Sequence, residues 1–203
     1  MTSQRTRRIA GNALLVALFL LFAYANFRSW RDTGRPVGFG ITILSATVAF
    51  LFIVRRPSEE TSRRAIAWLA APVGTFAMLL ARPVAHPHAG PGLALELVQL
   101  CGVVVAFAGL GMLGRSFGLV AANRGVKTSG LYRLVRHPVY AGYFLSDCGY
   151  VLENPSVRNV ALLAATVIGQ LVRIAEEERL LTADLTYRDY CSRVRYRLIP
   201  YLY

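Results

Sequence analysis

The sequence predicts an all-α integral membrane protein. Hydrophobic residues make up 55% of the 203 residues and the mean hydropathy is +0.43, a larger apolar share than soluble domains have. Each of four apolar runs is long enough, at about 1.5 Å per residue, to cross a hydrocarbon core of about 30 Å. Because lipid offers the backbone no hydrogen-bond partners, each run should be a helix. The runs cover residues 9–27, 37–54, 64–81 and 92–113.

Inside these runs, Gly40, Pro72, Gly74 and Gly102 are tolerable in a lipid setting, and we expect each run to continue through them. Small residues also let membrane helices approach closely. Three glycines near the end of the fourth run are expected to serve this packing role: Gly109, Gly111 and Gly114. The first run follows a basic start and exceeds a signal-peptide core in length, so we interpret it as a retained helix.

The composition of the chain changes from apolar to more polar after residue 114. This change divides the chain into a transmembrane helical region (1–114) and a second, predicted catalytic region (115–203). Residues 115–138 are too polar to span, and Gly125, Gly130 and Pro138 interrupt any long helix there. A short apolar run (139–153), a turn at Glu153-Asn154-Pro155-Ser156 and a second run (157–175) predict a helical hairpin. Fifteen residues reach only about 22 Å as a helix, so the hairpin should turn near the far interface and return.

An amphipathic tail is predicted from residue 178 to residue 203. Its many tyrosines and arginines suit the lipid headgroup level. On the helix that precedes it, Gln170, Arg173 and Glu177 have the spacing i, i+3, i+7 and so share one face. Asp147 lies within the short apolar run, where a carboxyl group is costly, and we expect it to have a structural partner.

Basic residues predict the orientation, because cytoplasmic connections are richer in lysine and arginine. The richer side contains the start of the chain, the second connection and residues 115–138, so we expect the N-terminus and this polar segment to be cytoplasmic. Its basic residues are Arg5, Arg7, Arg8, Arg55, Arg56, Arg63, Arg64, Arg115, Arg124, Lys127, Arg133 and Arg136. The opposite side has Arg28, Arg31, Arg35 and Arg82.

The net charge of +12 is compatible with a nucleic acid or with a membrane surface as partner. The basic residues lie at the ends of apolar runs rather than along a stripe with exposed aromatic residues. Membrane lipids are therefore the expected partners, and nucleic acid is not. Cys101, Cys148 and Cys191 are far apart and are expected to be small core residues.

No metal site is predicted. His86 and His88 form a possible pair, but they lie in a Pro/Gly-rich loop without a third ligand, so a solvated turn is the better interpretation.

The polar stretch 127–142, KTSGLYRLVRHPVYAG, concentrates functional side chains between two apolar regions. Ser129-Gly130-x-Tyr132 precedes Arg136-His137-Pro138-x-Tyr140-x-Gly142, and Arg173 with the cluster Glu176, Glu177 and Glu178 follows one hairpin later. Over residues 115–200 this pattern resembles the superfamily of isoprenylcysteine carboxyl methyltransferases and phospholipid N-methyltransferases. Tyr187 and Tyr190 match its paired tyrosines, although Ala183-Asp184 replaces the usual Phe-Gly.

The resemblance implies an integral-membrane methyltransferase that uses S-adenosyl-L-methionine, with a lipophilic small molecule or lipid as acceptor. Its donor brings its own activation, which fits a sequence without a recognisable catalytic triad. The implied cofactor contacts are Arg124, Gly125, Val126, Lys127, Tyr132, His137, Tyr140 and Glu177. Arg173 would orient the substrate. For an amine or thiol acceptor a base is needed, and Glu177 or Glu176 would supply it.

Two other functions stay open at this stage. Membrane sterol-type reductases resemble this architecture but bind a nicotinamide dinucleotide, although no Gly-x-Gly-x-x-Gly follows a predicted strand. A small transporter or scaffold would place ionisable residues across the bilayer midplane, where only Glu96 and Asp147 occur. The acceptor also stays open between prenylated cysteine, an ethanolamine headgroup, a small thiol and a fatty or phenolic acid. The sequence does not indicate an oligomeric state.

Overall fold

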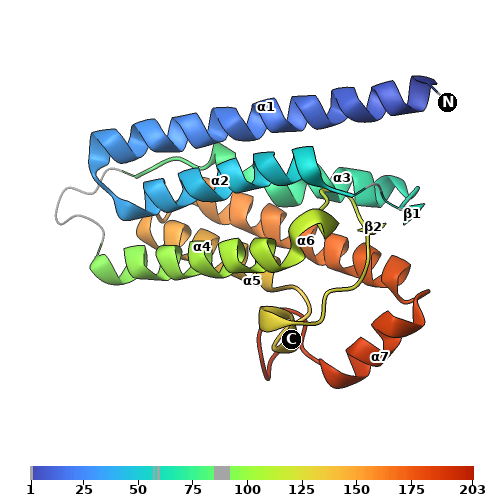
Figure 1. Cartoon of the computed structure of the whole chain (residues 1–203). Coiled ribbons are helices and arrows are strands. Elements are labelled where there is room, and N and C mark those ends of the chain that lie inside the picture. Colours follow the sequence, from blue (N-terminus) through green and yellow to red (C-terminus); the bar gives the residue numbers. More distant parts are fainter. Residues whose placement is uncertain (1, 57, 59, 85–91) are drawn as a thin grey trace.

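The computed structural model describes residues 2–56, 58, 60–84 and 92–203, and the pair His86 and His88 lies outside them. Seven α-helices account for most of this part of the chain (Figure 1). They are α1 (Thr2–Thr33), α2 (Pro36–Val54), α3 (Ala65–Phe76), α4 (Leu93–Leu113), α5 (Pro138–Glu153), α6 (Val157–Leu181) and α7 (Leu185–Arg193). Short 3-10 turns occur at η1 (Ala77–Leu80), η2 (Gly114–Ser116) and η3 (Gly130–Arg133).

Within the described residues, four helices are long and apolar enough to cross a membrane: α1 from Ile9 onward, α2, α4 with η2, and α6. The predicted all-helical class with apolar helices of membrane-spanning length is therefore confirmed, but one of the four expected spanning helices differs. The run 64–81 forms α3 and then tightens into η1, so its α-helical part ends at Phe76. The fourth long helix is instead α6, which includes Glu177, as expected, and continues six residues beyond the apolar run 157–175.

The helix boundaries follow from local sequence. Gly34 has φ +71°, a conformation that glycine adopts without strain, and Pro36 then opens α2. Pro138 likewise opens α5. The side chain of Ser156 accepts a hydrogen bond from the N–H of Asn159 and caps α6. These four signals are all readable in the sequence.

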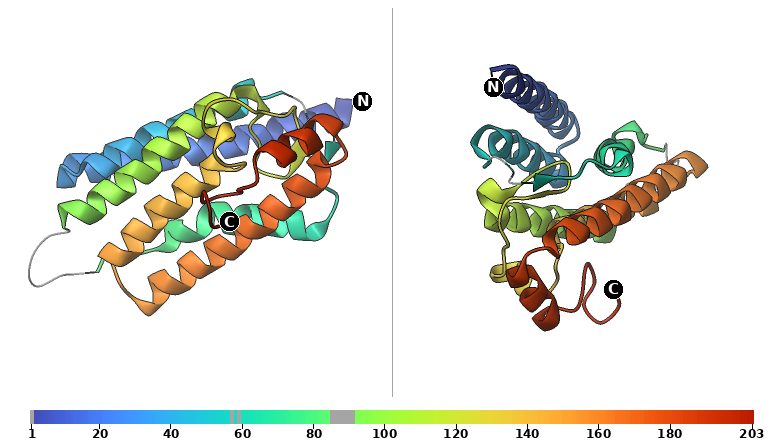
Figure 2. Two further views of the ribbon diagram at one scale, coloured as in Figure 1. Left: turned by 90° about the horizontal axis from the view of Figure 1, so that it is seen from below. Right: turned by 90° about the vertical axis from the view of Figure 1, so that its right-hand side faces the viewer.

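The bundle is built from pairs of neighbouring helices. α1 packs along α2, α4 along α5, and α3 along α6, while α5 and α6 contact each other less than either contacts its other neighbour. α5 and α6 therefore diverge from their three-residue connection rather than forming a closely packed hairpin (Figure 2). A core of buried residues from α2 and α4, including Val48, Phe52 and Leu110, joins these pairs.

Glycine permits two of these close crossings. A Cβ atom on Gly102 of α4 would collide with the backbone of Ser146 on α5, and one on Gly142 would collide with Ala106. Of the three glycines expected to act in packing, only Gly109 meets a neighbouring helix, at Val139. A Cβ on Gly111 would have no neighbour within 4 Å, and Gly114 ends α4 with φ +52°.

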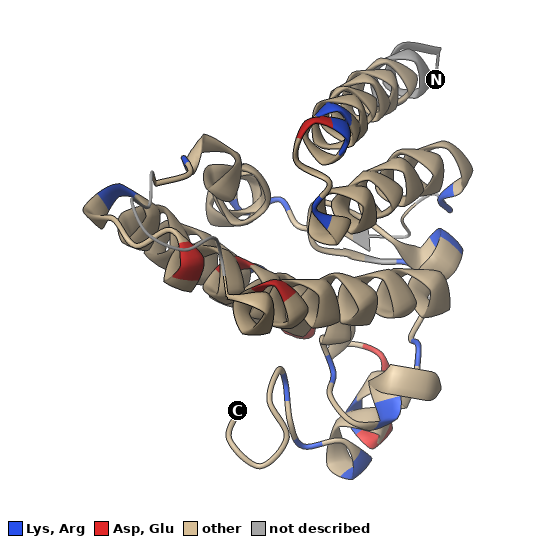
Figure 3. Ribbon diagram, turned by 90° about the vertical axis from the view of Figure 1, so that its left-hand side faces the viewer, with Lys and Arg blue, Asp and Glu red and all other residues tan. Residues whose placement is uncertain are grey.

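The segment between α4 and α5 is irregular, as expected. It includes β2 (Ala122–Asn123), which pairs antiparallel with β1 (Glu60–Thr61) in a ladder of two residue pairs. Figures 1 and 2 place α7 and the C-terminal segment on the side of the bundle away from α1, at the end where the N-terminus lies. In Figure 3 the lysines and arginines of the described chain lie mainly at helix ends and in connections.

Two expectations about single residues are wrong. Cys101 is exposed on α4 rather than being a core residue, while Cys148 and Cys191 are partly buried. Asp147 has no ion-pair or hydrogen-bond partner among the described residues, although a structural pairing was expected. Its position in α5 is one turn beyond Tyr143.

Candidate functional site

A cavity of about 120 Å³ lies at the N-terminal end of the bundle, between the helices and the segment that follows α4. Side chains from α1 to α7 and from the irregular segment line it. All nine residues that the sequence singled out as catalytic or cofactor-binding are among them: Arg124, Gly125, Val126, Lys127, Tyr132, His137, Tyr140, Arg173 and Glu177. The tertiary structure thus brings together residues that are more than 50 positions apart.

The start of α5 forms one wall of the cavity. Backbone N–H groups of Arg136 and His137 donate to the carbonyl oxygens of Tyr196 and Arg197, both at 2.9 Å. The segment after α7 therefore holds the turn that leads into α5. His137 is 7% exposed, and its ring stacks on that of Tyr140 with 5.7 Å between centroids.

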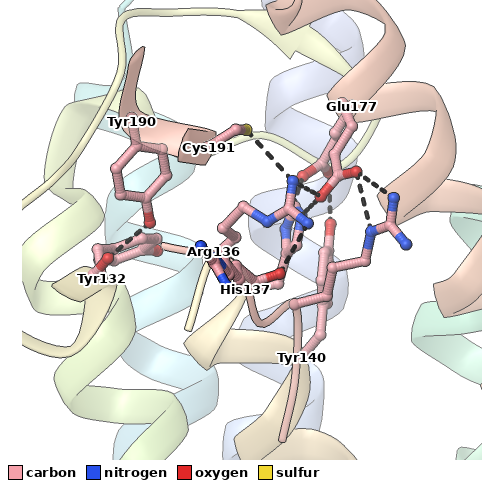
Figure 4. A network of polar contacts seen from close by, with 10 residues as sticks. Tyr132, Arg136, His137, Tyr140, Glu177, Tyr190 and Cys191 are labelled. Carbon is pink, nitrogen blue, oxygen red and sulfur yellow. Dashed lines mark hydrogen bonds and ion pairs between the residues drawn. The ribbon is translucent and has the colours of Figure 1, made fainter. Parts of the chain in front are cut away.

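Glu177 faces the same wall from α6 (Figure 4). The hydroxyl of Tyr140 donates to its Oε1 atom, and its Oε2 atom lies 3.8 Å from His137 Nδ1. The connection between α5 and α6 is only three residues long, so the chain leaves this end of the bundle and returns to it within two helices. The predicted proximity of the acidic cluster to the histidine-containing segment is present in the structure.

The three consecutive glutamates point to three different environments, because successive residues of a helix are rotated by about 100°. Glu176 accepts hydrogen bonds from Arg64 at 2.5 Å and from Arg179 and Ser62 at 3.2 Å each. It does not line the cavity. The suggestion that Glu176 could act as a base is therefore corrected, since its oxygens face β1 and the start of α3.

Glu178 is the partner of His137 that the sequence did not indicate. Its Oε1 atom lies 3.2 Å from His137 Nε2 and 3.1 Å from Arg136 Nη1. Its Oε2 atom accepts two hydrogen bonds from Arg197, at 2.9 Å and 2.8 Å. A carboxylate with this many cationic and N–H partners is well compensated for its burial.

Arg173 brings a cation into the cavity from α6, although it is only 5% exposed. Its Nη1 donates to Thr75 Oγ1 at 2.9 Å, and its Cζ lies 4.9 Å from the centre of the Tyr140 ring. Its Nε atom is buried without a hydrogen-bond partner among the described residues. Gln170 donates instead to the Gly74 carbonyl at 3.5 Å and does not line the cavity.

The segment from Arg124 to Lys127 forms the opposite wall. The Arg124 guanidinium packs against Gly118, where a Cβ atom would overlap with it, and Ser116 Oγ donates to the Arg124 carbonyl at 3.0 Å. Burial, with a smaller effect of Arg55, lowers the pKa of Arg124 to about 10. Gly125 has φ +94°, which favours glycine at this turn.

Buried tyrosines close the side of the cavity next to α7. Tyr190 donates its hydroxyl to the Tyr132 carbonyl at 2.6 Å (Figure 4). The Tyr187 and Tyr190 rings lie 5.8 Å apart. Burial raises the pKa of all three phenols, so they are neutral donors at physiological pH. The paired tyrosines of the tail thus pack against η3 despite the Ala183-Asp184 replacement.

The lining residues that the sequence did not single out include Phe19, Thr75, Phe117 and Tyr143. Phe19, Thr75 and Phe117 lie in or beside generic apolar runs, and nothing local distinguishes them from core residues. Tyr143 could have been predicted as a lining residue from the sequence, because it lies one helical turn after Tyr140 on the same face of α5. Of these residues, Thr75 matters most for the site, because its hydroxyl accepts a hydrogen bond from the guanidinium of Arg173.

Two comparisons with known proteins bear on the site. A family model described as phospholipid methyltransferase matches residues 89–186, which include α4, α5 and α6. Methanethiol S-methyltransferase 2 from Bradyrhizobium diazoefficiens (strain USDA 110) is 28% identical over 214 residues, covering 95% of this chain and 75% of that protein. Both matches include Arg173 and the glutamate cluster.

Proposed function

We propose that this chain, which belongs to the superfamily of membrane methyltransferases, transfers a methyl group from S-adenosyl-L-methionine to a lipophilic acceptor. The observation that carries the proposal is that Glu177, His137, Tyr140 and Arg173 all line one cavity. Residues 1–114 would serve as the membrane-embedded scaffold and residues 115–203 as the catalytic region.

The side chains around the cavity suit this donor. When bound, S-adenosylmethionine supplies a methyl group already activated by its sulfonium sulfur. Glu177 would accept from the ammonium group, and Arg124 with the backbone of 125–127 would bind the carboxylate. Tyr132, Tyr140 and the His137 ring offer aromatic surface to a cation and an adenine. The buried Nε atom of Arg124 has no hydrogen-bond partner among the described residues, which supports an anionic ligand at this wall.

Arg173 favours an acceptor with an anionic nucleophile. Its guanidinium is held by Thr75 and stacked over Tyr140, and its Nε atom has no partner among the described residues. A thiolate or carboxylate would be attracted to this cation and oriented by it, whereas an ammonium group would be repelled. For a neutral thiol, Glu177 would take the proton, because its carboxylate faces the same space.

The remaining walls exclude water and provide apolar contact. Phe19, Val48, Phe117, Val139 and Tyr143 line the part of the cavity towards the bundle. No side chain needs to form a covalent bond with the methyl group, because the residues act by holding two reactants in line at about 3–3.5 Å. A small thiol, as in the name of the relative, could be held in line in this way. A longer acceptor, either a prenylated cysteine or a fatty acid, could be held in the same way.

The orientation belongs to the same proposal. A water-soluble cofactor has to reach Arg124 and His137 from the cytoplasm, so the N-terminal end of the bundle would be cytoplasmic.

A methyl-transfer assay tests the proposed function. The purified protein in lipid nanodiscs would be incubated with methyl-labelled S-adenosylmethionine and, separately, a small alkane thiol, a prenylated cysteine, a fatty acid and phosphatidylethanolamine. We expect labelled thioether or ester products and no labelled amine. Transfer only to the ethanolamine amine would contradict the role of Arg173. Absence of transfer together with thermal stabilisation by NADPH alone would overturn the methyltransferase assignment.

A further inference from the structure

The side chains around His137 determine which of its two ring nitrogens carries a proton. A carboxylate accepts hydrogen bonds and cannot donate them, so the 3.2 Å contact between His137 Nε2 and Glu178 Oε1 requires a proton on Nε2. Two arginines also bind Glu178, and they balance its charge without the histidine. A neutral imidazole has one N–H, so Nδ1 is then a bare acceptor.

Nδ1 faces a second acceptor. Glu177 Oε2 lies 3.8 Å away, beyond hydrogen-bond distance, and Glu177 Oε1 already receives the Tyr140 hydroxyl. Two acceptors that face each other at this separation lack a shared donor. A primary ammonium group has three N–H donors and forms bonds of about 2.8–3.0 Å, so one nitrogen can reach both atoms.

We propose that Glu178 is a positioning residue that fixes the tautomer of His137, so that Nδ1 and Glu177 Oε2 together bind the ammonium group of the donor's amino-acid part. This inference rests on the proposed function, since it assumes a ligand with a primary ammonium group. Three further contacts hold the arrangement in place: the His137–Tyr140 ring stack, the His137 N–H to the Arg197 carbonyl, and the pair of bonds from Arg197 to Glu178.

The substitution Glu178→Gln reverses the donor pattern. A glutamine amide can donate to Nε2, which moves the imidazole proton to Nδ1, where it would bond to Glu177 and occupy the ammonium position. We therefore expect E178Q to weaken binding of S-adenosylhomocysteine about tenfold. Binding of the deamino analogue, in which hydrogen replaces the amino group, should change less than twofold, because it never used this pair of acceptors.

Calorimetry with both ligands on wild type, E178Q, R197Q and E176Q separates the tautomer effect from structural damage. R197Q removes the two hydrogen bonds from Arg197 to Glu178 but keeps the contact between Glu178 and His137. It should therefore retain the wild-type preference for the ligand that has the amino group. E176Q changes a glutamate that does not line the cavity and is the matched control. Equal losses for both ligands in E178Q would overturn the inference and leave the proposed function intact.

Nitrogen-15 NMR of the histidine-labelled wild type tests the tautomer without any ligand, and a variant is needed only to assign the signal. We expect a neutral His137 ring with the proton on Nε2, identified by comparison with the His137→Gln spectrum. A doubly protonated ring, or a proton on Nδ1, would overturn the inference. Failure of the wild type to bind S-adenosylhomocysteine would instead contradict the proposed function itself, and the ammonium site with it.

Discussion

Carboxylates with polar partners occur at both ends of the bundle, and their surroundings differ. At the end opposite the cavity, Glu153 of α5 contacts Arg35 through both oxygens, at 2.6 Å and 2.8 Å, and also accepts from Gln99 at 2.5 Å. At the cavity, Glu177 has the Tyr140 hydroxyl on one oxygen, while the other lies 3.8 Å from His137 Nδ1. Both carboxylates are attached to apolar helices, but Glu177 lines the cavity described above and Glu153 does not.

The difference shows why burial of charge alone does not identify a functional site. Glu153 is 6% exposed and strongly paired, so its interactions are complete within the protein and hold the α1–α2 connection against α4 and α5. Among the described residues, buried polar atoms without a hydrogen-bond partner occur at both ends, Arg35 Nε at the first and Arg173 Nε at the second, but Arg173 lines the cavity and Arg35 does not. Unused hydrogen-bonding capacity beside a cavity, rather than the carboxylate, is the feature that indicates a ligand.

The same substitution at the two ends separates these roles, and Glu177→Gln has the largest expected effect. Removing the charge that would bind the ammonium group should weaken S-adenosylhomocysteine binding by about a thousandfold, with little change in melting temperature. Calorimetry and thermal unfolding in the same detergent measure both quantities. If E177Q and the control E176Q bound the ligand equally well, the comparison between the two ends would lose its basis.

Arg173→Met should produce the next largest effect, and on a different quantity. The methionine keeps apolar bulk under Tyr140 but cannot hold an anionic acceptor, so kcat/KM should fall by about a hundredfold. Affinity for S-adenosylhomocysteine should stay within about twofold, because the guanidinium faces the acceptor side. Steady-state kinetics and calorimetry on one preparation check this, and a parallel loss of cofactor affinity would place Arg173 at the donor instead.

Glu153→Gln should have the smallest effect, and on stability alone. Arg35 loses its anionic partner but is about one-third exposed, with Glu96 at 3.8 Å, so the expected cost is about 2 kcal/mol, or roughly 6 °C in melting temperature. Ligand affinity, measured by calorimetry, should match that of wild type. A loss of affinity without a change in melting temperature would show that the far end also takes part in binding.

Helix positions were predictable because their signals are local. These signals lie within the helices they define or directly before them, as the apolar runs, Pro36, Pro138 and the Ser156 cap do. The structure places α2 and α4 within one residue of the expected bounds. The end of α6 was not predictable in this way. The sequence placed Glu177 on this helix, but α6 continues to Leu181, and the ion pairs of Glu176 with Arg64 and of Glu178 with Arg197 join it to segments that no local pattern reveals.

The candidate site was predictable as a set of residues but not as an arrangement. The Arg136-His137-Pro138 segment and the glutamate cluster were visible in the sequence. Which glutamate faces the cavity depends on the rotation of α6 about its axis, and that rotation is fixed where Gly74 lets α3 lie directly against Gly169. Thr75 comes next to Arg173 through the same crossing.

The sequence by itself determined the class of protein, the positions of the apolar segments and the kinds of side chain that meet at the cavity end of the bundle. These features depend on composition and short-range periodicity. Only the tertiary structure decided that Glu176 binds Arg64, Glu178 binds His137 and Glu177 meets the cavity. Three adjacent, chemically identical side chains are distinguished by what packs around them. Such packing arises from contacts between residues about 40 to 110 positions apart.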